Sequence, residues 1–583
     1  MNSMIKLNIE EFEHHYKRII RHFRFADANE LMLKAIEFVR HCNEIDTWKT
    51  REDLQSAVEK YETAQSTFLY NRKYNLLSQN LNDDIRELID YLAYCKSTGI
   101  LIKENCIALV KYILKNAPDH KTIIFDDSVY QLCNQLYDTV GNGSVYIPFE
   151  SNFYHSVMLG VQQPVYAEGG QHSKVPLLIN RILGNLEYRE SKAVENPAYV
   201  EEGFLQKFSK GFLVDPWGKK INFNEQTVER FGAMGNSHQN YLIQHLFQQV
   251  EDFAIVAVPI NFLTSAVQGE QNMRKWLLEQ KHLKAVVSLP TKMIRYSSIA
   301  SALLIFDFKN QFDGVRFLSL ANSEFVLKLN RETSLQNLDR LIDVINGTVE
   351  HSVAKFVDYN SIIRTNYVLH PERYILDNEA QQAVALLQKY ETQKLGNLVK
   401  IIRPESASLL RGSGDETIFE IQGGDLPDFG YIEVASKESF ISSDVFNHIE
   451  SSFLQEGDII ITVRGTVGKV GIVSQALLDK YDGRVIVGQT SLVLRVSYTD
   501  KISPIALLMQ LRSKLTQARL QPLAVGAVTA GLSLKDLKEF PVVLFSKEKQ
   551  QELLNRFLEQ VKIKQSIIAQ QIQIDELGND FWE

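Results

Sequence analysis

The sequence has little cysteine and no excess of basic residues. Its 583 residues include four cysteines, all in the first quarter of the chain and none in a C-x-x-C pair. That spacing excludes a zinc ribbon and a disulfide framework and is typical of buried thiols in a reducing cytoplasm. Lys and Arg number 63 against 71 Asp and Glu, a formal net charge of -8. A histone-like basic protein is therefore excluded, whereas a local basic groove is not.

Long hydrophobic runs are also missing. No apolar stretch approaches the roughly 20 residues that a membrane helix needs, and the N-terminal segment is too acidic for a signal peptide. Hydrophobic residues make up 45% of the chain and charged residues 23%, which excludes a largely disordered or collagen-like protein. We expect a cytoplasmic protein with no membrane contact and no metal site, divided into about three to five domains.

The first two regions differ in their hydrophobic period. Residues 1–135 are predicted to form a helical bundle, since Leu31, Ala35 and Val39 recur on one helical face. Residues 136–334 are predicted to form an α/β domain, because short apolar runs alternate there with helical patterns. The predicted strands are 144–149, 210–217, 253–260, 283–290 and 301–308, and the predicted helices are 238–250 and 270–280. Ligands of such sheets bind at the carboxyl ends of the strands.

The second half predicts three further segments. Residues 335–394 are interpreted as a connector that includes a helical stretch, QQAVALLQKYETQKLG. Residues 395–545 are rich in β-branched residues and glycine turns, which favours a β-rich domain. Residues 546–583 predict one long helix with an apolar seam that Lys564 interrupts. Such a helix needs a partner, and self-pairing as a coiled coil and docking within the same chain both remain open.

Two stretches carry a family resemblance. The runs NSHQNYLIQHLFQQVEDFAIVAVPINFL, QNMRKWLLEQKHLKAVVSLP and SSIASALLIFDF resemble the modification subunits of type I restriction-modification systems, which are adenine-N6 DNA methyltransferases. The runs LQEGDIIITVRGTVGKVGIV and GAVTAGLSLKDLKEFPVVLFSKEKQQELLNRF resemble the specificity subunits of the same systems. The resemblance implies a Rossmann-like methyltransferase domain followed by a single target-recognition domain, where specificity subunits usually carry two.

The catalytic motif of that family is altered in this chain. The family's Asn-Pro-Pro-aromatic loop accepts both amine hydrogens of the target adenine and stacks a ring on the flipped base. The matching stretch is GFLVDPWGKK. Aligned on Pro-aromatic-Gly, Val214 takes the Asn position and Asp215 that of the first Pro, while Pro216 and Trp217 are kept. Shifted by one residue, Asp215 becomes the acceptor and a proline is missing. A purely structural interpretation makes Trp217 a core aromatic and Asp215 a turn residue.

The cofactor motif departs further from the family pattern. The family's D-P-x-C-G-(S/T)-G turn uses glycines to let the backbone approach S-adenosylmethionine. In VYIPFESNFYHSV, Glu150 takes the Cys position and Phe153 that of the second Gly, where its ring is expected to fill the cofactor's space. A later Gly-Gln-Glu signature reads Gly170-Gln171-His172. The candidate cofactor residues are Pro148, Phe149, Glu150 and Phe153.

The last region is expected to read double-stranded DNA. Target-recognition domains hold DNA through phosphate contacts and read it with side chains on loops. The candidate contacts are basic residues together with one glutamine suited to adenine. They are Arg403, Arg411, Arg464, Lys469, Arg484, Gln489, Arg512, Lys514 and Arg519. A solvated surface charge is the competing interpretation for each of the basic residues.

Three functions therefore remain open. The first is a site-specific DNA-binding component of a restriction-modification or defence system with a catalytically degenerate methyltransferase body. The second is an active S-adenosylmethionine-dependent adenine-N6 methyltransferase with fused specificity. The third is a decoy that pairs with other restriction-modification subunits through the long helix. One recognition domain and one such helix also predict a homodimer on a split, palindromic target.

Overall fold

The computed structural model divides into two compact units, Met1–Pro371 and Glu372–Glu583, each described by itself. The structure describes residues 7–43, 48, 50–65, 76–116, 122–170, 174–214, 216–221, 230–232, 234–321, 323–329, 332–375, 387, 389–410, 414–520, 523–525 and 531–579. Within these ranges, no helix is long and apolar enough to cross a lipid bilayer.

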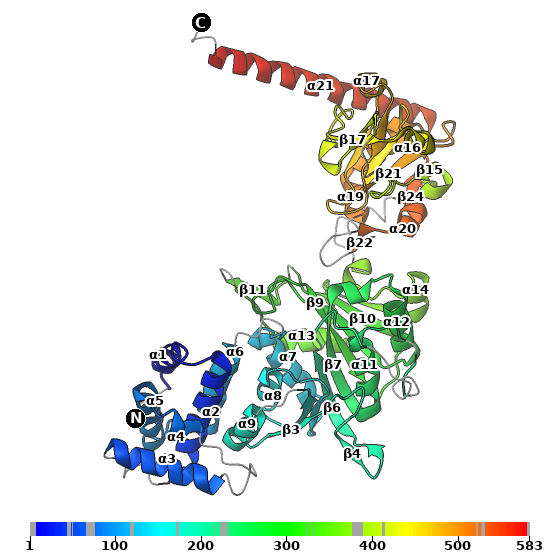
Figure 1. Cartoon of the computed structure of the whole chain (residues 1–583). Coiled ribbons are helices and arrows are strands. Elements are labelled where there is room, and N and C mark those ends of the chain that lie inside the picture. The colour runs from blue at the N-terminus through cyan, green and yellow to red at the C-terminus, as the bar shows by residue number, and fades with distance from the viewer. Residues whose placement is uncertain are drawn as a thin grey trace. The chain divides into compact units, whose positions relative to one another are not determined.

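Unit 1 begins with helices, as predicted (Figure 1, blue). They are α1 Ile9–Ile19, α2 Phe25–His41, α3 Arg51–Gln65, α4 Leu76–Gln79, α5 Asp83–Ser97, α6 Lys103–Lys115 and α7 Asp127–Asp138. The apolar face predicted on α2 is buried: Leu31, Ala35 and Val39 are at most 1% exposed. These side chains join one hydrophobic core with residues of the following α/β part, so the helices pack as part of unit 1.

A nine-stranded mixed sheet forms the body of unit 1 (Figure 1, cyan to green). Its order is β13-β10-β8-β9-β7-β6-β1-β2-β3. The strands are β1 Val145–Ile147, β2 Val165–Gly169, β3 Leu186–Glu190, β6 Phe208–Val214, β7 Val250–Pro259, β8 Leu283–Ser288, β9 Ser301–Asp307, β10 Gly314–Ser319 and β13 Ala354–Asp358. The pairs β13–β10, β8–β9 and β9–β7 are antiparallel, and the other pairs are parallel.

The order of the strands indicates where a ligand would bind. From β1 the chain proceeds outward through β2 to β3, and it then returns to the other side of β1 to form β6 and β7. The carboxyl ends of β1 and β6 therefore flank the point where the strand order reverses, which is where ligands bind in open α/β sheets. The helices around the sheet include α8 Tyr154–Leu159, α9 Val175–Leu183, α11 His238–Gln249 and α12 Gln268–Glu279.

The predicted connector differs from the structure over its first part. Helix α13 Leu338–Asn346 packs against α7, and β13 closes one edge of the sheet by pairing with β10. The sequence did not indicate this because most of β13 is exposed, including the adjacent Lys355 and Phe356, so it lacks the continuous apolar run of a central strand. Of the helical stretch predicted at 381–396, residues 381–386 and 388 lie outside the described residues. Its later part is not helical, because Thr392–Lys394 form a strand that pairs with Pro541–Val543.

Unit 2 is β-rich, as predicted. Its two larger sheets have the orders β15-β21-β18-β19 and β17-β16-β20. Their strands are β15 Val399–Ile402, β16 Glu416–Ile421, β17 Lys437–Ile441, β18 Ile459–Thr462, β19 Val470–Ile472, β20 Val485–Val487 and β21 Ser491–Val496. Other elements are β14 Thr392–Lys394, α18 Pro504–Arg512, α19 Lys514–Leu520, α20 Leu534–Glu539 and β24 Pro541–Val543.

The predicted long helix is α21, Lys547–Asn579 (Figure 1, red). Its first part packs on the body of unit 2, where Phe557 is fully buried and its ring contacts Tyr431 at 5.0 Å between centroids. Its later apolar side chains are exposed, among them Ile567 at 60% and Leu577 at 70%. Half of the helix is therefore docked within the chain, and the other half presents an uncovered apolar surface.

Candidate functional site

The turn after β1 is filled by the chain's own carboxylate. Glu150 is 1% exposed, and its side chain folds back under the turn toward the start of α8. One carboxylate oxygen accepts the backbone N–H groups of Ser151 (2.9 Å), Asn152 (3.2 Å) and Phe153 (2.9 Å). The other accepts the N–H (3.1 Å) and the hydroxyl (2.6 Å) of Ser156. Convergent N–H groups of this kind form an anion site, and Glu150 occupies it.

Phe153 keeps the backbone of a glycine. Its φ is +68°, in the left-handed region that favours glycine, at the position where the resembled family has Gly. Its ring is buried edge-on against Tyr188 of β3, with 5.0 Å between centroids. The ring thus lies between β1's turn and β3. That the Phe153 ring excludes a cofactor stays a prediction.

The acid at the end of β2 is also used internally. In dinucleotide-binding α/β folds an acid near this edge binds a ribose hydroxyl. Here Glu168 is fully buried, and it accepts the hydroxyls of Tyr146 and Ser191 and the N–H of Ala198 (2.8 Å). Burial raises the pKa of the Glu168 carboxyl, but hydrogen bonds from His245, Ser191, Tyr146 and Ala198 outweigh it, so the pKa lies below its ordinary value. The carboxylate is therefore ionised, and its oxygens accept hydrogen bonds from within the protein.

Two cavities open at this edge of the sheet. The first, here named the cofactor-edge cavity, measures about 460 Å³ and is lined by segments that follow β1, β2, β3 and β6. Its lining includes Pro148, Phe149, Glu150, Gly170, Lys192, Glu195, Lys219, Lys220 and His238. Its size falls in the range of small-molecule sites. Of the four predicted cofactor residues, the consecutive Pro148, Phe149 and Glu150 line this cavity, and Phe153 is not among its lining residues.

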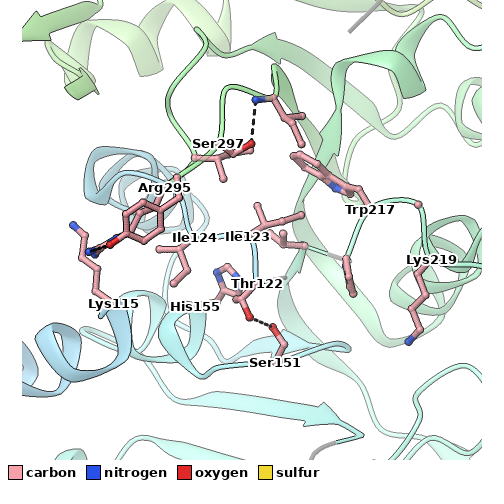
Figure 2. A pocket seen from close by; sticks show the side chains of 16 residues that line it. Lys115, Thr122, Ile123, Ile124, Ser151, His155, Trp217, Lys219, Arg295 and Ser297 are labelled. Atoms are coloured by element: carbon pink, nitrogen blue, oxygen red, sulfur yellow. Dashed lines mark hydrogen bonds between the residues drawn. The ribbon is translucent and has the colours of Figure 1, made fainter. Parts of the chain in front are cut away.

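The second cavity, here named the Trp217 cavity, measures about 780 Å³. Trp217 stands on one wall and Lys115 and Arg295 on the opposite one (Figure 2). The buried indole N–H of Trp217 has no hydrogen-bond partner within the described part of the chain. His155 also lines this cavity, and burial lowers the pKa of its imidazole, which is neutral and held by the Tyr130 hydroxyl at 2.8 Å.

The predicted catalytic residues lie beside this second cavity. Val214, at the end of β6, lines it together with Pro216 and Trp217. The third predicted residue, Asp215, lies outside the described residues, as do Gln171 and His172 of the later signature. The two cavities share Ser151 and Lys219, so they flank the same pair of strand ends. This arrangement can hold a flat ligand against Trp217 and a second group along the β1 turn.

In unit 2 the strand directions gather several predicted DNA contacts at one end of a sheet. β15 and β18 both run antiparallel to β21. The ends of β15 and β18 therefore lie beside the start of β21, and the start of β19 lies there too. The residues at these positions are Arg403 after β15, Arg464 after β18, Lys469 before β19 and Gln489 before β21. We name this group the strand-end cluster.

Members of the strand-end cluster differ in exposure. Arg403 and Arg464 are exposed, while Lys469 and Gln489 are partly buried. The side-chain amide of Gln489 donates to the carbonyl of Glu405. Arg411, on the loop that follows β15, lies outside the described residues. Two exposed guanidinium groups on neighbouring loops match what DNA contact requires.

Three other predicted DNA contacts bind groups within unit 2, and a fourth, Lys514, is exposed. Arg512 donates to the carbonyls of Val470 (3.2 Å), Pro427 (3.1 Å) and Gly430 (3.1 Å), and burial lowers its pKa to about 10. Arg519 stacks on Phe540, 4.8 Å from the ring centroid. Arg484 pairs with Glu416 at 2.9 Å. Lys514 is exposed at the start of α19.

The sequence reasoning missed the basic lining of the two cavities. Lys192 follows β3, Lys219 and Lys220 follow the Trp217 turn, and Arg295 follows a strand that the reasoning did predict. The Lys219-Lys220 pair directly after Pro-Trp-Gly was the one available signal. Lys192 and Arg295 converge on the site only through the order of the sheet, which local sequence does not reveal.

Two family models match the chain. The N-6 DNA Methylase model matches residues 135–383, and the Type I restriction modification DNA specificity domain model matches residues 388–575. A curated relative, the methylase subunit of the type I restriction enzyme MpnII from Mycoplasma pneumoniae, is 30% identical over 115 residues. That match covers 19% of this chain and 21% of the relative, so it spans about a fifth of the relative's length.

Solved structures are similar to the chain at low identity. The type I methyltransferase subunit from Streptococcus thermophilus is 15% identical with a TM-score of 0.45, covering 59% of this chain and 80% of that chain. The type IIG restriction endonuclease BpuSI is 11% identical with a TM-score of 0.48, covering 92% and 72%. The two family matches together run from 135 to 575, and they show that the chain carries an N-6 DNA methylase domain followed by a type I restriction-modification DNA specificity domain.

Proposed function

We propose that this chain is the site-specific DNA-binding component of a restriction-modification or related system, and that its methyltransferase-like unit no longer transfers methyl groups. The two domains support a function in DNA modification. The loss of methyl transfer rests on one observation above all. In the turn that should receive the cofactor, the backbone N–H groups donate to the Glu150 carboxylate instead.

The family implies S-adenosylmethionine as the cofactor, and the residues present do not fit it. A carboxylate already sits in the turn, and the acid at the β2 edge is enclosed by Tyr146 and Ser191. Binding the cofactor would require Glu150 to leave a site where it accepts five hydrogen bonds, which costs several kcal/mol by rough count.

The competing proposal is an active adenine-N6 methyltransferase with fused specificity. One observation favours it: Trp217 keeps the family's aromatic ring and lines a cavity large enough for a base. A neutral His155 lies in the same cavity. The two proposals share DNA recognition and differ only in chemistry, so they are separated by the methyl-transfer measurement described in the Discussion.

DNA recognition is tested by selecting duplexes from a random pool with the full chain. We expect enrichment of a defined sequence and an affinity that falls steeply with salt, because Lys and Arg contacts to phosphates release counterions. Recovery of an unenriched pool bound in a salt-dependent manner would leave a nonspecific DNA binder. No binding at any salt concentration would instead favour the decoy function.

We also propose that two copies pair through α21. Ile563, Ile567, Ile574 and Leu577 are all more than half exposed, and their spacing places them along one side of the helix. Two paired copies would present two recognition domains, the number usual in specificity subunits. Light scattering should then give a dimer for the full chain and a monomer for the Ile567→Glu/Ile574→Glu variant. A strict monomer with and without DNA would end this proposal.

A further inference from the structure

The cofactor-edge cavity carries the wrong charge for the family's cofactor. Three of its lining residues are lysines: Lys192, Lys219 and Lys220. The carboxylates in the described lining are Glu150, which is consumed by the β1 turn, and Glu195, which pairs with Lys192 at 3.1 Å. S-adenosylmethionine carries a sulfonium and an ammonium against one carboxylate, so its net charge is positive. Like charges in a shared cavity repel.

The lysines are placed to meet an anion beside a ring. The ammonium of Lys219 lies 4.8 Å from the centroid of Phe149 and 3.5 Å from Nε2 of His238. In Figure 2 its side chain points away from the Trp217 cavity, which it borders only at its base. Lys219 and Lys220 are exposed, so neither ammonium is buried against protein. An ammonium, an imidazole and an aromatic face within one small cavity suit a phosphate attached to a flat base.

We propose that the cofactor-edge cavity binds a phosphate-bearing nucleotide in place of a sulfonium nucleoside. The phosphates would lie against Lys219 and Lys220, and the base would lie beside Phe149 in the same cavity. This inference rests on the proposed loss of the cofactor, since a bound sulfonium nucleoside would occupy the same space. The phosphate comes either from a free nucleotide or from a nucleotide of a DNA strand, since both present the same chemistry.

Calorimetric titration of the full chain with ADP, adenosine and S-adenosylmethionine tests the charge argument. ADP should bind most tightly, adenosine more weakly by about tenfold, and S-adenosylmethionine most weakly. ADP affinity should fall with added salt, and that of adenosine should not. Tighter binding of S-adenosylmethionine than of adenosine would overturn the inference, and so would an absence of ADP binding.

Two variants locate the site. Lys219→Gln should weaken ADP binding by about tenfold and leave adenosine binding unchanged. Lys207→Gln is the matched control, because Lys207 is an exposed lysine of the same unit outside the cavity lining. Equal effects of the two substitutions would contradict the assignment. A labelled ADP that a short single-stranded oligonucleotide displaces indicates DNA as the source of the phosphate, and a label that stays bound indicates a free nucleotide.

The outcomes also separate this inference from the proposed function. If neither ADP nor S-adenosylmethionine binds, the nucleotide site is wrong and the proposed loss of methyl transfer stands. If S-adenosylmethionine binds tightly and transfers its methyl group, both are wrong.

Discussion

Replacing Glu150 by alanine is expected to lower the free energy of unfolding of unit 1 by about 3 kcal/mol. The carboxylate accepts the N–H groups of Ser151, Asn152, Phe153 and Ser156 and the hydroxyl of Ser156. Its removal leaves these donors at a site that is almost fully buried, where an unmade hydrogen bond is costly. Chemical denaturation followed by circular dichroism measures the change, with proteolysis to assign it to unit 1.

Glu195→Ala is the matched control for this substitution. Glu195 lines the same cavity, but it is exposed and pairs with Lys192, and exposed ion pairs contribute less than about 1 kcal/mol. We expect the control to change stability little. Glu150→Gln should fall between the two, because the amide keeps one acceptor and turns its NH₂ toward N–H donors. Equal stability of Glu150→Ala and Glu195→Ala would show that the turn does not depend on its carboxylate.

The double variant Arg403→Ala/Arg464→Ala is expected to weaken DNA binding by about 100-fold. Both guanidinium groups are exposed at the strand-end cluster, one after β15 and the other after β18. A lost phosphate or base contact costs about 1–3 kcal/mol. Fluorescence anisotropy with the selected duplex at several salt concentrations measures both the affinity and the salt slope, which should become shallower.

Arg484→Ala provides the control for charge. Arg484 is partly exposed and pairs with Glu416, at a position away from the strand-end cluster. Its loss removes one positive charge from unit 2, half of what the double variant removes, and should weaken binding by no more than a few-fold. A loss as large as that of the double variant would place the DNA surface elsewhere on unit 2.

The strands that the sequence predicted well include those with other strands at both edges and buried residues on both faces. β7 and β9 lie in the interior of the sheet, and their apolar runs are visible as such. β2 and β3 were not predicted. β3 is an edge strand with exposed Glu187 and Arg189, and β2 carries Glu168 into a buried hydrogen-bonded cluster. Polar residues at an edge or in a buried network hide a strand from a search for apolar runs.

The sequence indicated where the candidate site lies, but it did not indicate the role of Glu150 there. The altered motif located the β1 turn, but the sequence marked Glu150 only as a lost cysteine position. Its role depends on where the side chain points, and the carboxylate turns inward to the N–H groups. In unit 2 the sequence could not separate exposed Arg464 from Arg512, whose Nε and Nη2 donate to the carbonyls of Val470 and Gly430. The two arginines differ in their packing, which residue type alone does not reveal.

We expect that the methyltransferase-like unit does not use S-adenosylmethionine. This is tested most directly by incubating the full chain with the selected duplex and S-adenosylmethionine carrying an isotopic methyl label. We expect no label on adenine N6 and no saturable binding of the cofactor by calorimetry. Label on adenine above that of a control without protein, together with saturable binding, would contradict it.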